Sequence, residues 1–266
     1  MTSTKAWRWL GALAMLTACG RDAPPPSARA AVPAAAPGPL PAGVELLEAR
    51  VARAAGEPAR VHGVRADLAQ VALRVVVSPA PRDQWLTAES AAAQSGAIAA
   101  LNGGFFDDHS RPLGLLVADG RQVGRLRRAD WGVFYVRGGR AHLVHTRDAR
   151  GLTGVEQAVQ CGPRLVIAGA PTRLKPSDPA PRSAVGIDAA GRVLFVAVQG
   201  GGLPLSAFAK VLARPVDAGG FGCRDALNLD GGPSTQFCVP GRVSLVGAYG
   251  MPTHLVLVPR DSVTRR

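Results

Sequence analysis

The sequence predicts an α+β fold: a single domain in which a large, mostly antiparallel, twisted β-sheet core carries a few flanking helices. The first observation behind this prediction is that short runs of apolar and β-branched residues recur along the chain, as they do in strands. The second is that tight glycine turns separate many of these runs. The third is that two segments combine helical spacing of apolar residues with a capping residue.

The expected turns and strands follow from the same local chemistry. Glycine adopts a positive φ without strain, so a Gly-Arg turn between two apolar runs predicts a β-hairpin. These turns lie at residues 119–121, 138–140, 190–192 and 240–242. The expected strands cover residues 71–77, 113–118, 132–136, 141–145, 193–198 and 255–258.

Two helices are expected between the strands. Thr87 can cap a helix over residues 88–94, in which Glu89 lies favourably in the first turn. Ser206 can cap a second helix over residues 207–213. Each helix precedes a short apolar strand that ends at a glycine motif, residues 97–101 and 226–229.

Residues 1–18 have the features of a lipoprotein signal peptide. Lys5 and Arg8 precede an apolar segment that is too short to span a bilayer permanently. This segment ends in Leu-Thr-Ala before Cys19, which resembles the lipobox of bacterial lipoproteins, so we expect lipidation of Cys19. A plain secretory signal is the alternative. Because Gly20 follows the cysteine, the expected location is the periplasmic face of the outer membrane in a bacterial envelope.

After the signal, residues 19–43 combine the lipidated cysteine with a Pro- and Ala-rich tether. Residues 44–266 are long enough for one domain with a substantial core, and we expect a monomer. No further apolar segment is long enough to cross a membrane. Cys161, Cys223 and Cys238 remain, and one disulfide plus one free thiol is the simplest expectation, with the pairing open.

The charge balance is strongly basic. The formal net charge is +12, and removal of Lys5 and Arg8 with the signal peptide leaves +10. An arginine-rich surface favours anionic substrates. The sequence contains neither a Lys/Arg run nor a series of aromatic residues for base stacking, so we expect no nucleic-acid partner.

The most informative segment is Ala226-Leu227-Asn228-Leu229-Asp230-Gly231-Gly232-Pro233-Ser234-Thr235. Asn228 and Asp230 are two residues apart, so their side chains should leave the same face of a strand. Gly231 and Gly232 then let a ligand approach the backbone and expose amide groups to an anion. An ordinary hairpin turn is the alternative.

A second segment, Asn102-Gly103-Gly104-Phe105-Phe106, has the same design. An amide again stands at the end of an apolar strand, beside glycines that expose the backbone. Asp107 follows and can supply an acid or base, with a solvated turn as the alternative. At least one of the two phenylalanine rings should pack in the core.

Three further elements complete the set. Arg182, in Pro-Arg-Ser-Ala-Val-Gly, can hold a phosphate or carboxylate in a bidentate manner. Gly162 lies in a Cys-Gly-Pro-Arg turn that enters a strand. Gln199 opens a Gln-Gly-Gly-Gly segment at the end of the strand expected over residues 193–198.

In this order, the five elements resemble the phosphodiester glycosidase domain family. Its pattern is Asn-Gly-Gly-Phe-Phe, a Gly-Pro turn, Arg-(Thr/Ser)-Ala-x-Gly, and Ala-Leu-Asn-Leu-Asp-Gly-Gly before small hydroxyl residues. The resemblance covers roughly residues 60–260, nearly all of the expected domain. The Gly-Cys-Arg sequence at residues 222–224 looks closest to the bacterial, periplasmic branch.

The resemblance implies hydrolysis of a sugar 1-phosphodiester, in which phosphate is the leaving group. Asp230 would act as general base on water or as nucleophile, and Arg182 would hold the phosphate. Asn102 and Asn228 would orient sugar hydroxyls or the Asp230 carboxylate, and Asp107 is the reserve second carboxylate. The remaining substrate-binding candidates are Gly103, Gly104, Phe105, Gly162, Gln199, Gly231, Gly232, Ser234 and Thr235.

The sequence departs from the family pattern at two places, and the second of them, together with the basic charge balance, favours an alternative function. Pro233 replaces a third glycine, and Gln199 opens the segment where many members carry Asp-Gly-Arg. The alternative is a non-catalytic envelope lipoprotein that binds anionic glycan through the same pocket. No cofactor is expected, because the five histidines form no zinc pattern. Ca²⁺ bound by Asp230 or Asp107 and backbone carbonyls remains an alternative.

Overall fold

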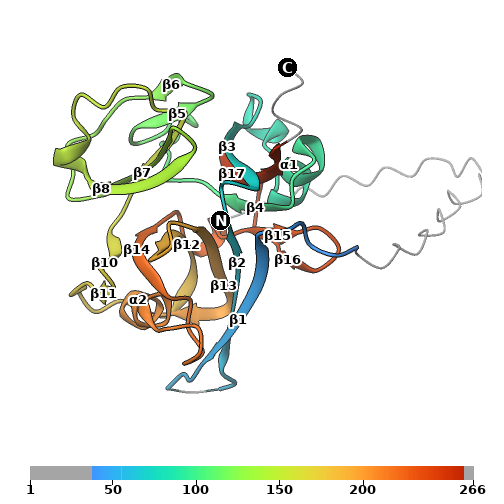
Figure 1. The fold of residues 1–266 in the computed structure, drawn as a ribbon, viewed down its shortest axis with the longest axis vertical. Helices are drawn as coiled ribbons and strands as arrows, with labels where there is room; N and C mark the ends of the chain where they lie inside the picture. Colours follow the sequence, from blue (N-terminus) through green and yellow to red (C-terminus); the bar gives the residue numbers. More distant parts are fainter. Residues whose placement is uncertain (1–37, 55, 261–266) are drawn as a thin grey trace, which may run out of the picture. The chain divides into compact units, whose positions relative to one another are not determined.

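The computed structural model describes residues 38–54 and 56–260, whose strands form three antiparallel sheets (Figure 1). The expected signal peptide, Cys19 and most of the expected tether lie outside the described residues. The largest sheet has the order β1-β2-β13-β12-β14-β10-β11. Its strands are β1 (Val44–Val51), β2 (Ala59–Ala66), β10 (Arg164–Ile167), β11 (Ala170–Pro171), β12 (Ala180–Asp188), β13 (Val193–Leu203) and β14 (Cys223–Asn228).

Two five-stranded sheets complete the fold. The second sheet has the order β16-β15-β4-β17-β3, with β3 (Val71–Val77), β4 (Ala99–Asn102), β15 (Phe237–Val239), β16 (Val243–Leu245) and β17 (Thr253–Pro259). The third has the order β6-β5-β9-β7-β8, with β5 (Leu116–Ala118), β6 (Arg121–Gly124), β7 (Gly132–Arg137), β8 (Arg140–His145) and β9 (Gln157–Cys161).

All three sheets contribute to one apolar core. Its members alternate along the strands, so that one face of each sheet packs inward. Representative fully buried members are Phe195 of the first sheet, Phe237 of the second and Phe134 of the third. The predicted α+β class is therefore confirmed, with the expected β-sheet core divided among three sheets. All four predicted hairpin turns join paired strands.

One predicted strand is shorter than expected. The strand predicted over residues 113–118 begins only at Leu116. The Leu113 amide donates to the Phe105 carbonyl, and Gly114 packs against the Gln160 side chain, so this stretch follows the loop rather than the sheet.

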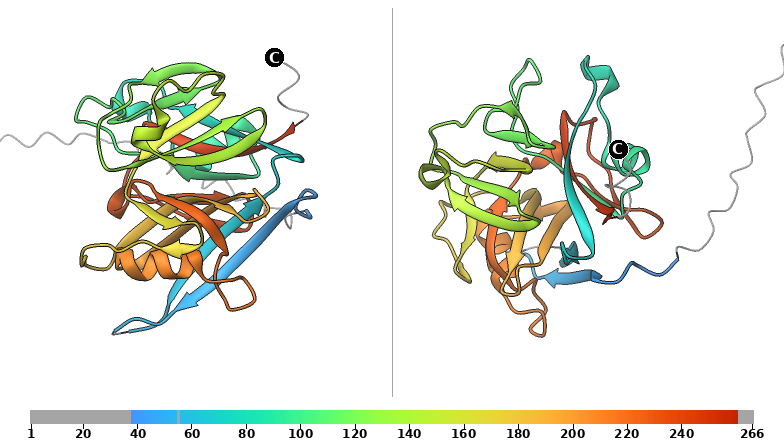
Figure 2. Two further views of the ribbon diagram at one scale, coloured as in Figure 1. Left: turned by 60° about the vertical axis from the view of Figure 1, so that its left-hand side comes forward. Right: turned by 45° about the horizontal axis from the view of Figure 1, so that its top comes forward.

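The two α-helices of the described region cover outer faces of sheets (Figures 1 and 2). Helix α1 (Ala88–Ser95) packs on the second sheet, and α2 (Leu205–Ala213) packs on the first. Neither is long and apolar enough to cross a membrane. Three-residue and four-residue 3₁₀ turns lie at η1 (Arg82–Gln84), η2 (Thr146–Ala149) and η3 (Gly232–Ser234).

The two helix caps differ. Thr87 caps α1 as predicted, and its side chain forms a reciprocal capping box with Ser90. The predicted Ser206 cap is wrong, because Pro204 occupies the cap position of α2 and Ser206 lies exposed inside the helix. The first amide of α2, on Leu205, instead donates to the Ser177 hydroxyl at 2.9 Å.

This difference gives a stability prediction. Thr87→Ala should lower the free energy of unfolding by about 1 kcal/mol, because the Ser90 amide loses its side-chain acceptor. Ser206→Ala is the matched control and should change it by less than about 0.5 kcal/mol. Urea unfolding of both variants measures the difference, and equal effects would contradict the cap assignment.

The expected disulfide is absent from the described residues, and this prediction is wrong. Cys161, Cys223 and Cys238 are all buried free thiols. They belong to three different apolar clusters, the shared core and the layers under α2 and α1. Burial raises the pKa of Cys161 to about 12 and that of Cys238 to about 11, so both stay protonated at neutral pH.

Candidate active site

Asp230 lies where the ends of three strands meet. Leu229 and Asp230 continue the chain beyond β14: the Asp230 amide donates to the Gly103 carbonyl beyond β4 (3.2 Å), and the Leu229 amide donates to the Ser183 carbonyl of β12 (2.9 Å). The Asp230 carbonyl accepts from Asn102 Nδ2 at 2.8 Å and from Ser183 Oγ at 2.9 Å. The main chain of Asp230 is thus fixed by residues from two different sheets.

Asn102 acts on this main chain rather than on a ligand. It is completely buried, and Nδ2 donates to both the Gly103 and Asp230 carbonyls. Its Oδ1 accepts from the Gln236 amide at 3.1 Å. Because main-chain groups occupy both ends of this amide, we assign Asn102 a role in positioning the Asp230 main chain, where the sequence suggested that it orients either sugar hydroxyls or the Asp230 carboxylate.

The Asp230 carboxyl group is half-buried beside η3. Burial raises its pKa from the ordinary value, while hydrogen bonds from the Ser234 hydroxyl and the Gly231 amide partly oppose this rise. The Asp230 charge in turn helps to raise the pKa of the buried Cys161 thiol, which therefore lies near the carboxylate. An aspartate held this way can accept a proton more readily than an exposed one.

Arg182 brings a positive charge to the same place. A Cβ added to Gly231 would lie 3.8 Å from Arg182 Nη1, and the Gly231 amide itself binds the Asp230 carboxylate. The guanidinium donates to two carbonyls, Leu203 O at 3.1 Å and Asp178 O at 2.9 Å. Desolvation lowers its pKa, and it forms no salt bridge with any carboxylate of the described residues. This charge is available to an anionic ligand.

Asn228 supports the neighbouring Gly162 turn. Its Nδ2 donates to the Gly162 carbonyl at 3.0 Å and to the Leu229 carbonyl at 2.7 Å. Its Oδ1 is buried and has no partner within residues 38–54 and 56–260. The bond between Gly162 and Pro163 is cis. Asn228 therefore faces the turn, whereas Asp230 lies beyond the end of β14.

The glycines of the Asn-Gly-Gly motif serve close packing. A Cβ on Gly103 would lie 2.1 Å from Thr253 Oγ1, and one on Gly104 would lie 3.1 Å from the Gln160 carbonyl. The Gly103 amide already donates to the Thr253 carbonyl at 2.8 Å. The Gly103 amide is therefore not free to bind a ligand.

Phe105 and Gly162 share an aromatic neighbour that the sequence analysis missed. The Phe105 ring lies edge-on to Trp131, with centroids 5.3 Å apart, and a Cβ on Gly162 would lie 2.5 Å from the Trp131 ring. Ser183 was also missed as a site residue, although it directly follows Arg182 in the recognised motif. No local signal in the sequence marks Trp131.

The residues after Asp230 form a braced loop. Ser234 is buried and its hydroxyl also lies 3.2 Å from the Tyr249 hydroxyl, whereas Thr235 is buried with an Oγ1 that has no partner in the described region. Gln199 Nε2 donates to the Thr235 carbonyl at 2.9 Å and to the Val246 carbonyl at 2.8 Å. Gln199 thus supports the loop through its amide. The neighbouring Gly232 has a φ of +59°, which favours glycine.

Asp107 lies on a separate loop. Its carboxylate binds the Arg111 guanidinium at 2.9 Å and the amides of His109 and Arg111. The Arg111 amide is the main cause that lowers its pKa. No contact links it to Asp230 in the part of the chain that the structure describes. Nor does that part contain a group of three or more His, Cys, Asp or Glu side chains placed to hold a metal.

His254 gives a pH-dependent prediction. It is completely buried on β17, opposite Asn102, and burial lowers its pKa to about 4. In the unfolded chain the His254 imidazole takes up a proton near pH 6.5, whereas in the folded chain it does so only near pH 4. The contribution of His254 to the free energy of unfolding is therefore fully present above pH 6.5 and is lost as the pH falls towards 4. The total loss from this group should be about 3 kcal/mol.

The His254→Leu variant should lose much of the pH dependence of unfolding between pH 7 and 4.5. The exposed His109→Leu variant is the matched control and should keep it. Urea unfolding at both pH values measures the slope. An unchanged slope in His254→Leu would assign the acid sensitivity to other groups.

Comparison with known proteins identifies the family to which this sequence is similar. Residues 95–256 match the phosphodiester glycosidase (NAGPA) family. The uncharacterized protein YigE of Escherichia coli K12 is 32% identical over 112 residues, which is 38% of this chain and 44% of that protein. The match thus spans less than half the length of this relative.

Solved structures share the fold. The catalytic domain of zebrafish N-acetylglucosamine-1-phosphodiester alpha-N-acetylglucosaminidase, auto-inhibited by its pro-peptide, has a TM-score of 0.62 at 19% identity, over 84% of this chain and 85% of that one. A hypothetical protein from Synechocystis has a TM-score of 0.58 at 16% identity, over 82% and 62%. A putative exported protein from Burkholderia pseudomallei has a TM-score of 0.55 at 14% identity, over 76% and 74%. With the family match over most of its domain, this chain belongs to the phosphodiester glycosidase family.

Proposed function

We propose that this protein hydrolyses a sugar 1-phosphodiester, with Asp230 and Arg182 as its catalytic residues. The observation that carries the proposal is a half-buried carboxyl group followed in the chain by Gly231, which packs against the Arg182 guanidinium, a group that forms no salt bridge among the described residues. A bound phosphodiester would supply the missing negative charge. Family membership supports the same chemistry.

In the proposed reaction, the bond between the sugar C1 and the phosphate oxygen breaks. Arg182 binds the phosphate and stabilises the charge that develops on it as it leaves. Asp230 either takes a proton from the water that attacks C1 or attacks C1 itself before water releases the sugar. The products are the free sugar and a phosphate monoester on the other half of the substrate. A neutralised phosphate is already a good leaving group, so no second carboxylate is required to protonate it.

The proposed setting is the bacterial envelope. It rests on the signal-like residues 1–18 and on the lipobox-like sequence before Cys19. Lipidation would anchor the domain to a membrane whose neighbouring polymers carry phosphate and carboxylate groups. Incorporation of labelled fatty acid into the full chain, but not into Cys19→Ala, tests this part independently of activity.

The direct test is sugar release from matched substrates. Sugar 1-phosphodiesters such as UDP-GlcNAc should be cleaved, whereas nitrophenyl glycosides of the same sugars, which lack the phosphate, should remain intact. Arg182→Gln should abolish the preference for phosphodiesters. Cleavage of both classes alike would contradict the role of Arg182. Saturable binding of phosphodiesters without release would instead support the alternative function, a non-catalytic glycan-binding protein.

A further inference from the structure

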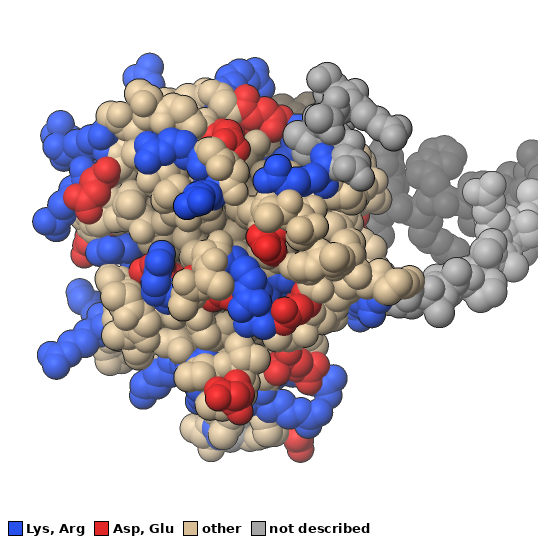
Figure 3. All heavy atoms as spheres, viewed as in Figure 1, with Lys and Arg blue, Asp and Glu red and all other residues tan. Residues whose placement is uncertain are grey.

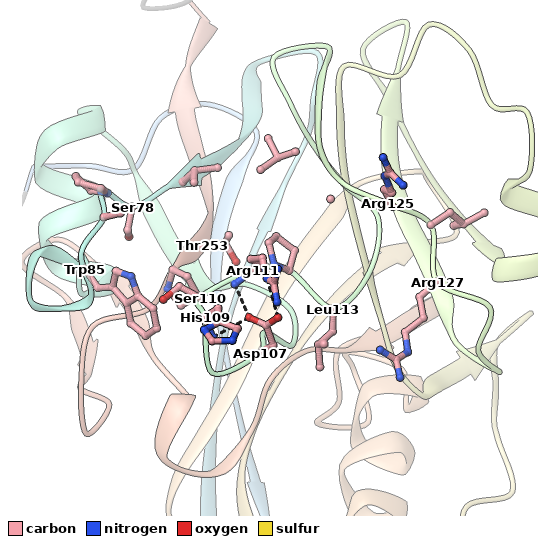
Figure 4. A pocket seen from close by; sticks show the side chains of 18 residues that line it. Ser78, Trp85, Asp107, His109, Ser110, Arg111, Leu113, Arg125, Arg127 and Thr253 are labelled. Atoms are coloured by element: carbon pink, nitrogen blue, oxygen red, sulfur yellow. Dashed lines mark hydrogen bonds and ion pairs between the residues drawn. The ribbon is translucent and has the colours of Figure 1, made fainter.

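A hollow lies beside the loop of Asp107, and Thr253 on its lining contacts Gly103, whose carbonyl accepts from the Asp230 amide. It has a volume of about 750 Å³ and is bounded by the segment after β3, the loop that carries Asp107, and the segment after β6. Figure 4 shows Trp85 and Ser78 on one side, Arg125 and Arg127 on the other, and Asp107 with Arg111 between them. Neither Asp230 nor Arg182 lines this hollow.

The lining is positively charged. Arg111 is neutralised by Asp107 at 2.9 Å. Arg125 and Arg127 are exposed, and neither forms a salt bridge within the described ranges. On the face shown in Figure 3, lysine and arginine side chains are interspersed with acidic ones. Two guanidinium groups without a carboxylate partner thus face one hollow from the same segment after β6.

The arginine wall is held in place by a buried side chain. Gln160 is 2% exposed, and its Oε1 accepts from the Arg127 and Leu115 amides, each at 2.9 Å. Its Nε2 donates to the Arg127 carbonyl at 2.8 Å. The Arg127 guanidinium also lies 5.7 Å from the centre of the Trp131 ring. A fixed backbone reduces the entropy lost when a ligand binds.

The opposite wall carries the aromatic ring of Trp85, with the Arg82 guanidinium 5.0 Å from the ring centre. The Trp85 ring is partly exposed and packs edge-on against Phe106, with centroids 5.2 Å apart. Its neighbour Phe105 packs against Trp131, which covers the Gly162 turn beside the Asp230 site. Of the two adjacent phenylalanines, Phe106 thus packs against Trp85 in the hollow and Phe105 packs against Trp131 beside the Asp230 site. An amphipathic ring opposite two guanidinium groups suits a sugar that carries a negative charge.

We propose that this hollow is a second binding site, for an anionic saccharide that carries phosphate or carboxylate groups. Arg125 and Arg127 bind the anionic groups, and a sugar ring lies against Trp85. That the bound saccharide belongs to an extended substrate rests on the proposed function, whereas the binding itself does not.

Binding is measured by calorimetry in the Asp230→Asn background, so that no turnover intervenes. The probes are tetragalacturonate, maltotetraose phosphorylated at C6, and neutral maltotetraose. Arg125→Gln with Arg127→Gln should weaken binding of both anionic probes at least about tenfold, because two charged contacts are lost. Arg121→Gln with Arg128→Gln removes the same charge outside the hollow and should change binding less than about twofold.

Three results would overturn the proposal. These are no binding of either anionic probe, equal weakening in the two double variants, and loss of binding in Arg182→Gln, which would place the probe at the Asp230 site. If the hollow binds these probes but no phosphodiester is cleaved, the proposed hydrolysis fails and the second site stands. If both hold, the Arg125/Arg127 variant should raise KM for anionic extended substrates while kcat and the KM for short substrates stay unchanged.

Discussion

Asp230→Asn is expected to lower sugar release from phosphodiesters by about 10²–10⁴-fold, the range for loss of a general base, and further if the carboxylate is the nucleophile. The fold should survive, because the main chain of Asp230, not its carboxylate, makes the bonds to Gly103, Asn102 and Ser183. Turnover by purified variant and wild type, with matching circular dichroism and unfolding curves, measures the effect.

Asp107→Asn is the matched control for this experiment. The same change occurs at a carboxylate that already binds Arg111 and two amides, away from the carboxyl group of Asp230. Turnover should therefore fall by less than about threefold, as for a substitution outside the reacting groups. Near-normal turnover in Asp230→Asn together with a large loss in Asp107→Asn would reverse the two roles.

Asn102→Ala is expected to lower the free energy of unfolding by about 3 kcal/mol or more. It removes three hydrogen bonds and leaves the Gln236 amide without its buried acceptor. Turnover should also fall, since the Asp230 peptide loses one of the two side chains that hold it. Urea unfolding with an unchanged denaturant dependence gives the stability change.

Ser183→Ala separates this effect from general damage near the site. It removes the other donor to the Asp230 carbonyl while the Asn102 bond remains, so the expected cost is about 1 kcal/mol. If Asn102→Ala proved no more destabilising than Ser183→Ala, the central position that we assign to Asn102 would be wrong.

Local elements could be predicted because their causes are local. The Thr87 cap and the glycine hairpins depend on residues within a few positions of one another. The division into three sheets depends on pairings such as β4 with β17, which lie far apart in the sequence. The Ser206 cap failed for the same reason: the distant Ser177 hydroxyl accepts the hydrogen bond from the first amide of α2.

The position of the site could be predicted from the sequence, but the roles of its individual residues could not. Asn102 and Asp230 were expected to act together, and they make contact across 128 positions. The sequence could not show that the side-chain amide of Asn102 forms all of its hydrogen bonds with main-chain groups. Nor could it separate Asp107 from Asp230, since both lie close to a Gly-Gly pair at the end of a strand. Trp131 was missed because its role depends on the folded positions of Phe105 and Gly162.

The two hydrogen bonds to the Asp230 carbonyl have a consequence for how such a protein can evolve. Asn102 and Ser183 bind the main-chain carbonyl of residue 230, which every amino acid possesses. The side chain at this position can therefore be replaced while these hydrogen bonds remain. If the proposed hydrolysis holds, a single substitution at Asp230 would remove the reaction and leave a stable saccharide-binding protein. Enzymes and receptors built on this scaffold can therefore be separated by one inherited change.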